Sequence, residues 1–196
     1  DESAPATVEM VYRLIVALGV PLTPEIATAL WVGLLTDTGS FRYQCTTAGA
    51  MEFGQRILET RISTWDVSSH VYESQAIERI RLLGRVLDTL WISPAGRTAV
   101  LTMSDELLAE LGCDASLGDG FINHARGIEG VEVAVMMTGS DTRGYKISFR
   151  SRGSLDVALL AQRFGGGGHR HAAGCFIEAP ATEIRTRLAG VVEALG

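Results

Sequence analysis

Apolar positions recur at helical spacing through the first part of the chain. Residues 4–18 show an apolar face with this spacing, which predicts a helix. Thr23–Glu25 is a strong start for a second helix, because it supplies a cap, a first-turn proline and an acid near the positive end of the helix dipole. A third helix is predicted over about 47–59. A longer helix over about 73–87 has one charged face and is predicted to connect two domains.

The pattern changes from about residue 86 to short strands separated by helices. Strands are predicted over about 86–92, 98–102, 131–137, 144–150 and 175–178, the first two as a hairpin. Helices are predicted from Ser104, near 116–126, from a Ser154 cap to about Phe164, and over 181–194. This alternation predicts an α/β fold for the second half of the chain.

The glycine run Gly165–Gly168 is followed at once by His169, Arg170 and His171. Successive glycines lose backbone entropy on folding and are kept where the backbone bends sharply or approaches something closely. Backbone amides with His and Arg side chains suit a phosphate or a carboxylate. A flexible linker is the alternative, but linkers run longer, whereas apolar segments flank this short run.

The strand near 144–150 places Lys146, Ser148 and Arg150 on one face by alternation. We therefore expect Arg150, His169 and the amides of the glycine loop, Gly166–Gly168, to converge on one phosphate. The alternative is an edge strand that simply exposes polar residues to water.

Charge is unevenly distributed along the 196 residues. The net charge is −6, which argues against bulk coating of long nucleic acids. From Arg143 to Arg170, however, six cations and one acid give +5, so the rest carries −11. This basic segment predicts one local anionic ligand, with a solvated basic face as the alternative.

Asp37 ends an apolar helix and precedes a Thr-Gly-Ser turn, which suits either a hard-metal ligand or a turn-forming residue. Asn123 and Arg126 share a helix face and are candidate substrate contacts, although a surface role is equally open. Three cysteines without a paired motif fit a reduced, cytoplasmic protein, and no apolar run is long enough for a membrane span.

Four segments in order resemble the DHH/DHHA1 family of phosphoesterases. Gly165–Gly174 resembles the GGGHxxAAG signature of the DHHA1 domain, and Ser148–Ser151 matches its SxRS strand. Phe121–Val131 resembles the VNxxRxIxGV segment, and Thr36–Phe41 resembles the last conserved motif of the preceding DHH domain. Within the family, the match is best to the small bacterial oligoribonuclease and pAp phosphatase type.

The resemblance implies a helical rear part of a DHH domain over 1–72, a linker helix over 73–87 and a DHHA1 domain with a mixed sheet over 88–196. It implies hydrolysis by a two-manganese site, with Asp37 as a catalytic metal ligand. The implied substrates are short RNA, pAp and linear dinucleotides such as pApA. The residues implied to bind substrate are Asn123, Arg126, Ser148, Arg150, Gly166, Gly167, Gly168 and His169.

The chain departs from the family pattern, because no Asp-His-His motif is present and Asp37 alone cannot hold two metal ions. We therefore expect a C-terminal portion that is inactive alone and forms a homodimer. A non-catalytic nucleotide- or RNA-binding module, a RecJ-like exonuclease fragment and a cyclic-dinucleotide phosphodiesterase fragment are the alternatives. An oligomerisation fragment is a further alternative.

Overall fold

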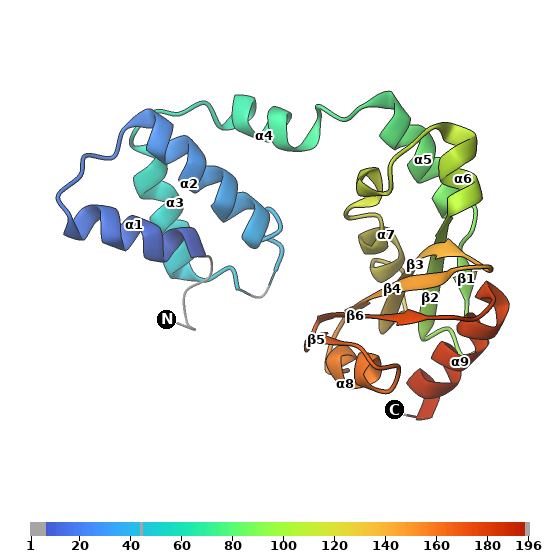
Figure 1. Ribbon diagram of the computed structural model, residues 1–196. Coiled ribbons are helices and arrows are strands. Elements are labelled where there is room, and N and C mark those ends of the chain that lie inside the picture. Colours follow the sequence, from blue (N-terminus) through green and yellow to red (C-terminus); the bar gives the residue numbers. More distant parts are fainter. Residues whose placement is uncertain (1–6, 44, 195–196) are drawn as a thin grey trace. The chain divides into compact units, whose positions relative to one another are not determined.

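The computed structural model describes residues 7–43 and 45–194, and the chain divides into two compact units, residues 1–75 and 76–196 (Figure 1). The first unit is helical, and the second combines helices with a six-stranded sheet. The α/β class expected from the sequence is therefore confirmed. The start of the helix predicted over 4–18 lies outside the described residues.

The helical unit is organised around its second helix. Its elements are α1 (Thr7–Ala17), α2 (Pro24–Asp37), α3 (Ala48–Leu58) and α4 (Thr64–Tyr72). Side chains of Thr23, Thr47 and Ser63 cap α2, α3 and α4 by accepting a hydrogen bond from a backbone N–H three residues later. The helix α2 contacts α1, α3 and α4, and buries Leu30 and Leu34 in the shared core.

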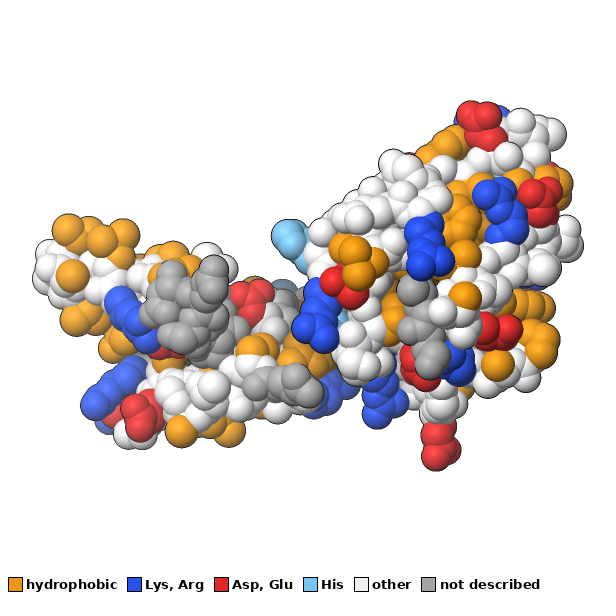
Figure 2. Space-filling view, turned by 90° about the horizontal axis from the view of Figure 1, so that it is seen from below, with side chains coloured by type: hydrophobic (Ala, Val, Ile, Leu, Met, Phe, Trp, Pro, Cys, Tyr) orange, Lys and Arg blue, Asp and Glu red, His pale blue; other side chains and the backbone are white. Residues whose placement is uncertain are grey.

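Apolar side chains also reach the surface of the helical unit (Figure 2). Leu18 is 68% exposed, Trp65 is 67% exposed and Leu14 is 58% exposed. The four helices therefore do not bury among themselves all of the apolar surface that their sequences carry.

The sheet of the second unit is mixed. Its strands are β1 (Trp91–Ile92), β2 (Thr98–Ser104), β3 (Val133–Ser140), β4 (Gly144–Ser151), β5 (Gly167–His169) and β6 (Ala172–Ile177), in the order β1-β2-β3-β4-β6-β5. Only the β2–β3 pair is parallel. The chain between these two strands forms α6 (Asp105–Leu111), a short 3₁₀ turn (Ala115–Gly118) and α7 (Ile122–Arg126), as a parallel pair requires.

Two hydrophobic cores lie on the two faces of this sheet. One contains Val135 and Phe149 and is completed by α8 (Val157–Gln162) and α9 (Ala181–Ala194). The other contains Ala134 and Met136 and is completed by α5 (Ile77–Leu87), α6 and α7. The second core covers the sheet near β2 and β3, and its described residues include none from β4, β6 or β5, although α7 also contacts β4.

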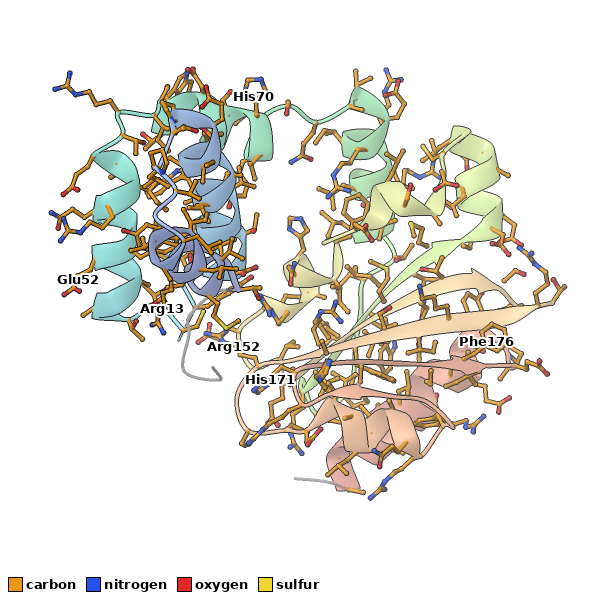
Figure 3. All side chains as sticks on the ribbon, turned by 60° about the vertical axis from the view of Figure 1, so that its left-hand side comes forward. Arg13, Glu52, His70, Arg152, His171 and Phe176 are labelled. Carbon is orange, nitrogen blue, oxygen red and sulfur yellow. The ribbon has the colours of Figure 1, made fainter. Side chains whose placement is uncertain are left out.

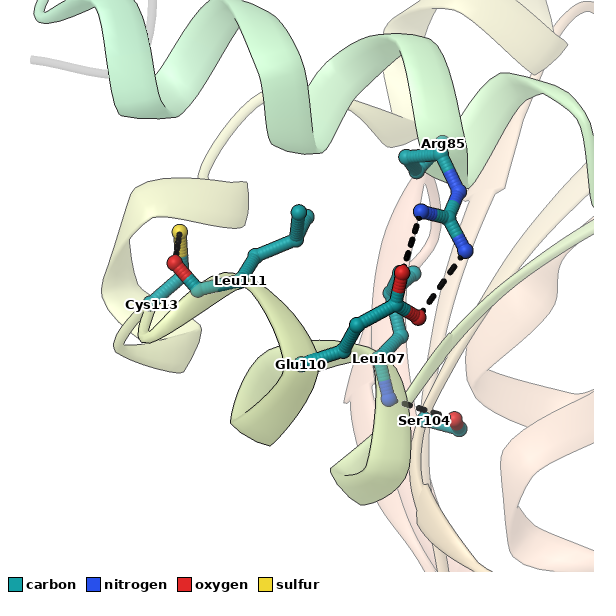
Figure 4. A network of polar contacts seen from close by, with 6 residues as sticks. All are labelled: Arg85, Ser104, Leu107, Glu110, Leu111 and Cys113. Carbon is teal, nitrogen blue, oxygen red and sulfur yellow. Dashed lines mark hydrogen bonds and ion pairs between the residues drawn. The ribbon is translucent and has the colours of Figure 1, made fainter.

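The helix α5 is built into the second unit rather than standing apart. Leu82 and Val86 are fully buried in its core. Arg85 forms a two-pronged ion pair with Glu110 of α6, at 2.7 and 3.0 Å, and Ser104 caps α6 through the Leu107 amide at 3.2 Å (Figure 4). The helix expected over 73–87 begins at Ile77, and the separate helix α4 was not anticipated.

Three other expected elements differ from the structure. The strand predicted over about 86–92 is only Trp91–Ile92, because α5 continues to Leu87. The helix predicted near 116–126 is a 3₁₀ turn followed by α7, interrupted at Gly120, whose φ is +83°. The helix α8 is capped by Asp156, which accepts from the Ala158 amide at 2.8 Å, and not by Ser154. The carboxylate of Asp156 is one residue from the first helical turn, where orphan amides need acceptors.

Candidate functional site

The strand β4 separates core side chains from polar ones. Tyr145, Ile147 and Phe149 are buried in the core beneath α8 and α9. Lys146, which is exposed, and Ser148 and Arg150, which are partly exposed, occupy the opposite face. The alternation expected for this strand is therefore confirmed, although β4 ends at Ser151, so that Arg152 lies outside it.

Strand register aligns Arg150 with His169 across the open face. Arg150 pairs with Ala172 of β6, and Ala172 pairs with His169 of β5. Directly paired residues share a face, and two strand spacings amount to about 10 Å. The small Ala172 side chain between them leaves room for the arginine and histidine side chains to reach the same ligand.

A second row runs parallel to the first, two residues along each strand. Ser148 pairs with Gly174, and Gly174 pairs with Gly167. Both glycines lack a side chain, so this row forms a shallow floor with a single hydroxyl. We call Ser148, Arg150, Gly167, His169, Ala172 and Gly174 the open face. Four of these six residues were assigned to substrate binding in the sequence analysis. The other two, Ala172 and Gly174, were not.

The second half of the glycine run, Gly167 and Gly168, belongs to strand β5 and not to the loop expected from the sequence, whereas Gly165 lies in a turn and Gly166 leads into the strand. A Cβ at Gly166 would lie 2.1 Å from the Gly174 carbonyl oxygen, and a Cβ at Gly168 would lie 2.5 Å from Ala173 Cα. Glycine at these positions therefore lets β5 pair closely with β6. A Cβ at Gly167 would meet nothing within 4 Å. Contact of the amides of Gly166 and Gly168 with a substrate stays a prediction.

The end of the sheet around the open face is cationic. Arg150, Arg152 and Arg170 form no ion pair with any carboxylate in the described part of the chain. The nearby carboxylate of Glu132 is bound by Arg97 at 2.8 and 2.9 Å, and this bond lowers the Glu132 pKa. The positive charge is therefore left to attract an anion.

The helix α7 brings the two remaining candidates beside the sheet. Ile122 and Ala125 anchor α7 in the core, and the helix contacts β2, β3 and β4. Asn123 is exposed and Arg126 is partly exposed. Their contact with a substrate on the open face stays a prediction.

A cysteine lies close to the open face but points away from it. Cys175 pairs with Ile147 on the core side of β6. Burial raises the pKa of its thiol to about 11, so that the thiol stays protonated at neutral pH. Cys175 is therefore not a nucleophile of this site.

The helical unit holds Asp37 at the last position of α2, where it is exposed. An unusual turn follows, in which Gly39, Ser40 and Phe41 all have φ near +60°. The buried Thr38 hydroxyl supports this turn by donating to the Leu34 carbonyl at 2.6 Å and accepting from the Phe41 amide at 3.0 Å. Because Asp37 is exposed, its carboxylate carries no burial penalty that a bound cation would have to offset.

The residues around Asp37 do not by themselves form a metal centre. In residues 7–43 and 45–194 no group of three or more His, Cys, Asp or Glu side chains is arranged to hold a metal ion. A two-metal site needs several such ligands. The residues present therefore do not fit the two-manganese centre implied by the family, and no chemical step is assigned to a metal here.

Sequence reasoning missed the contribution of His171 and Ser151 at the same end of the sheet. The Ser151 hydroxyl lies 3.0 Å from His171 Nδ1. A signal was present, because His171 follows His169 by two residues and Ser151 belongs to the SxRS segment. Pattern alone gave no reason to pair positions twenty residues apart.

The second unit is an α/β domain whose open sheet face and its surroundings carry arginines with no ion pair among the described residues, a surface that suits an anionic ligand. Comparisons with known proteins agree with this class, since residues 99–194 match the family described as the DHHA1 domain. This part of the chain belongs to the DHHA1 domain family. No helix among the described residues is long and apolar enough to cross a bilayer.

Three relatives illustrate the match. The bifunctional oligoribonuclease and PAP phosphatase NrnA of Thermus thermophilus is 34% identical over 91% of this chain and 53% of its own length. NrnA of Bacillus subtilis is 26% identical over 90% of this chain and 56% of its own length. An exopolyphosphatase-related protein from Bacteroides fragilis, 26% identical, has a TM-score of 0.90, covering 99% of this chain and 58% of that one. The chain thus spans about half the length of these relatives.

Proposed function

We propose that the chain is part of a phosphoesterase that hydrolyses short oligoribonucleotides, pAp and linear dinucleotides such as pApA. In this proposal the second unit holds the terminal phosphate of the substrate. The observation that carries the proposal is the row Arg150–Ala172–His169 on the open face. The names of the two NrnA relatives support the same substrate class.

The terminal phosphate would lie over Ala172. The planar guanidinium of Arg150 would bind two phosphate oxygens, which is the geometry that arginine favours with phosphate. One of its N–H groups already donates to the Phe149 carbonyl at 2.9 Å, which restrains the side chain beside β4. His169 would donate to a third oxygen, and the Ser148 hydroxyl and Gly167 would contact the next part of the substrate. Asn123 and Arg126 of α7 are proposed as outer contacts.

Charge distribution supports a preference for short substrates. The +5 segment from Arg143 to Arg170 attracts one phosphate group, whereas the −11 of the remaining chain repels a long polyanion. A site that binds the terminal phosphate also measures the length of the oligonucleotide from that end. We therefore propose that substrates are short and are bound through a terminal phosphate.

We further propose that Asp37 is a metal ligand of the complete enzyme, that the ion is Mn²⁺, and that the enzyme is a cytoplasmic homodimer. The other metal ligands would have to come from residues beyond those described here. The chain by itself is accordingly expected to lack phosphoesterase activity.

The test measures both binding and hydrolysis. Calorimetric titration of the chain with pApA should show binding, and Arg150→Ala should weaken it at least tenfold, about 1.4 kcal/mol. Lys146→Ala is the matched control, because it removes one positive charge from the same face of β4, four residues and about 13 Å away.

Hydrolysis is then assayed with Mn²⁺, with and without the portion of the Thermus thermophilus relative that this chain does not match. Activity only with that portion, lost in Asp37→Ala, supports the proposal. Equal pApA affinity in wild type and Arg150→Ala would refute the phosphate clamp.

A non-catalytic binding module remains the second candidate, because the described residues contain no metal-binding cluster. It differs in one result. A binding module would bind pApA with the same affinity in the wild type and in Asp37→Ala. It would not hydrolyse pApA under any of these conditions.

A further inference from the structure

A buried hydroxyl fixes the orientation of a second histidine beside the open face. Ser151 ends β4 and is only 4% exposed. Its hydroxyl donates to the Arg170 carbonyl at 3.3 Å and lies 3.0 Å from His171 Nδ1. The Ser151 amide also donates to the His171 carbonyl at 3.3 Å. Three contacts therefore tie the turn between β5 and β6 to the end of β4.

Counting protons assigns the state of the imidazole ring. A serine hydroxyl has one hydrogen and two acceptor lone pairs. The Arg170 carbonyl can only accept, so both contacts are satisfied together only when the hydroxyl donates to this carbonyl and accepts from a proton on His171 Nδ1. The neutral ring then has only a lone pair on Nε2, and the imidazolium form has an Nε2–H donor.

The surroundings of His171 are rich in positive charge. The residues around it are Arg170 of its own turn, His169 of β5, Arg150 of β4 and Arg152, which follows β4. Figure 3 shows Arg152 and His171 close together at this end of the sheet and Phe176 at the other end. Two acids lie on neighbouring elements, and both are engaged. Asp156 caps α8 and Glu132 binds Arg97.

We propose that Ser151 and His171 form a second phosphate position, adjoining the Arg150–His169 row, that takes the other phosphate of a doubly phosphorylated short nucleotide. His171 is the binding residue, which donates from Nε2 in its imidazolium form, and Ser151 is the positioning residue. The inference rests on the proposed function and deepens it, because it selects substrates that carry two phosphate groups, such as pAp and pApA, over those that carry one.

This arrangement makes the second position dependent on pH. A neutral His171 presents a lone pair to phosphate oxygens, which are acceptors, whereas the imidazolium donates to them. Protonation of His171 is therefore coupled to phosphate binding at this position, and His171→Asn, which has no Nε2, should remove that coupling. Affinity for pA, which carries the terminal phosphate but lacks the second one, should change much less.

A purely structural role for the Ser151–His171 bond is the competing explanation, and His171→Asn separates the two. The asparagine amide can replace Nδ1–H as the donor to Ser151 but has no counterpart of Nε2. We expect His171→Asn to keep the thermal stability of the chain, to weaken pApA about tenfold at pH about 6, and to reduce its pH dependence. Ser151→Ala should weaken pApA binding less than His171→Asn does. It should also no longer hold the proton of the neutral His171 ring on Nδ1.

The experiment combines calorimetry with pApA and pA on the full chain and nitrogen-15 NMR of the histidine rings. The wild type should show the Nδ1–H tautomer of His171 at alkaline pH, and Ser151→Ala should show the more common Nε2–H tautomer. An Nε2–H tautomer in the wild type, or unchanged pApA affinity in His171→Asn while Arg150→Ala weakens binding, would overturn this inference and leave the proposed function intact. No pApA binding by the wild type would overturn both.

Discussion

The glycine run offers a test in which neighbouring residues should respond oppositely. In Gly166→Ala the added methyl would lie 2.1 Å from the Gly174 carbonyl oxygen and 2.5 Å from Cys175 Cβ. Both contacts are with β6, which is paired with β4 on one side and β5 on the other and cannot move far. In Gly167→Ala the methyl meets nothing within 4 Å, and Gly167 does not have a positive φ.

The magnitudes follow from these contacts. Overpacking of a fitted site costs about 1–3 kcal/mol, so we expect Gly166→Ala to lower the free energy of unfolding of the second unit by that amount. Loosening of β5 is the alternative way to relieve the same strain. Gly167→Ala should leave stability within about 0.5 kcal/mol of the wild type. Its methyl would nevertheless protrude from the floor at Gly167, on the face proposed to hold the ligand, and should weaken pApA binding.

The assay is amide hydrogen exchange of the peptide spanning residues 165–177, with calorimetric unfolding of the full chain in parallel. Exchange of this peptide should accelerate in Gly166→Ala and remain unchanged in Gly167→Ala. Equal stability and equal exchange in the two variants would refute the claim that Gly166 is required by strand packing. Unchanged pApA affinity in Gly167→Ala would refute the placement of the ligand on this floor.

Three further changes test the fold around the site. Phe149→Ala removes a fully buried ring from the core beneath the open face and should destabilise the second unit by about 3–5 kcal/mol, measured by urea unfolding. The Ala181 amide donates to the Asp141 carboxylate at 2.8 Å and thereby lowers the pKa of Asp141. The stabilisation of the fold by this ionised carboxylate is complete above its unfolded-state pKa and is lost as the pH falls through its folded-state pKa. Asp141→Asn should therefore show a smaller loss of Tm on acidification than the wild type. Thr38→Val leaves the Phe41 amide without its acceptor and should cost the helical unit about 1–3 kcal/mol, seen in its thermal unfolding, whereas Thr36→Val, at an exposed position of the same helix, should cost less.

Elements with local signals were predictable from the sequence. The helix α2 begins where Thr23–Glu25 supplies its cap and first turn, because these interactions involve residues that are close in the chain. The faces of β4 follow from alternation, which a strand imposes on any sequence. The helix α4 was missed even though the cap Ser63 was present, because its short apolar face gave a weak pattern.

Elements that depend on distant contacts were not predictable in the same way. The strand β5 consists of two glycines and a histidine, so no side-chain pattern marks it. It forms because β6 offers an unpaired edge and the absent side chains permit close pairing. Likewise, α5 looked like a connecting helix until the burial of Leu82 and Val86 in the second core was known.

The sequence alone determined which residue types are available for an anionic ligand and, through its motifs, the family. The positively charged segment, the alternation in β4 and the residues around His169 all lie within short stretches of chain. Only the tertiary structure decided that Arg150 and His169 flank Ala172 in one row, and that Ser151 holds His171. The physical reason is that strand register is set by packing of whole sheet faces, so pairing between distant segments is decided when the core forms and not by either segment alone.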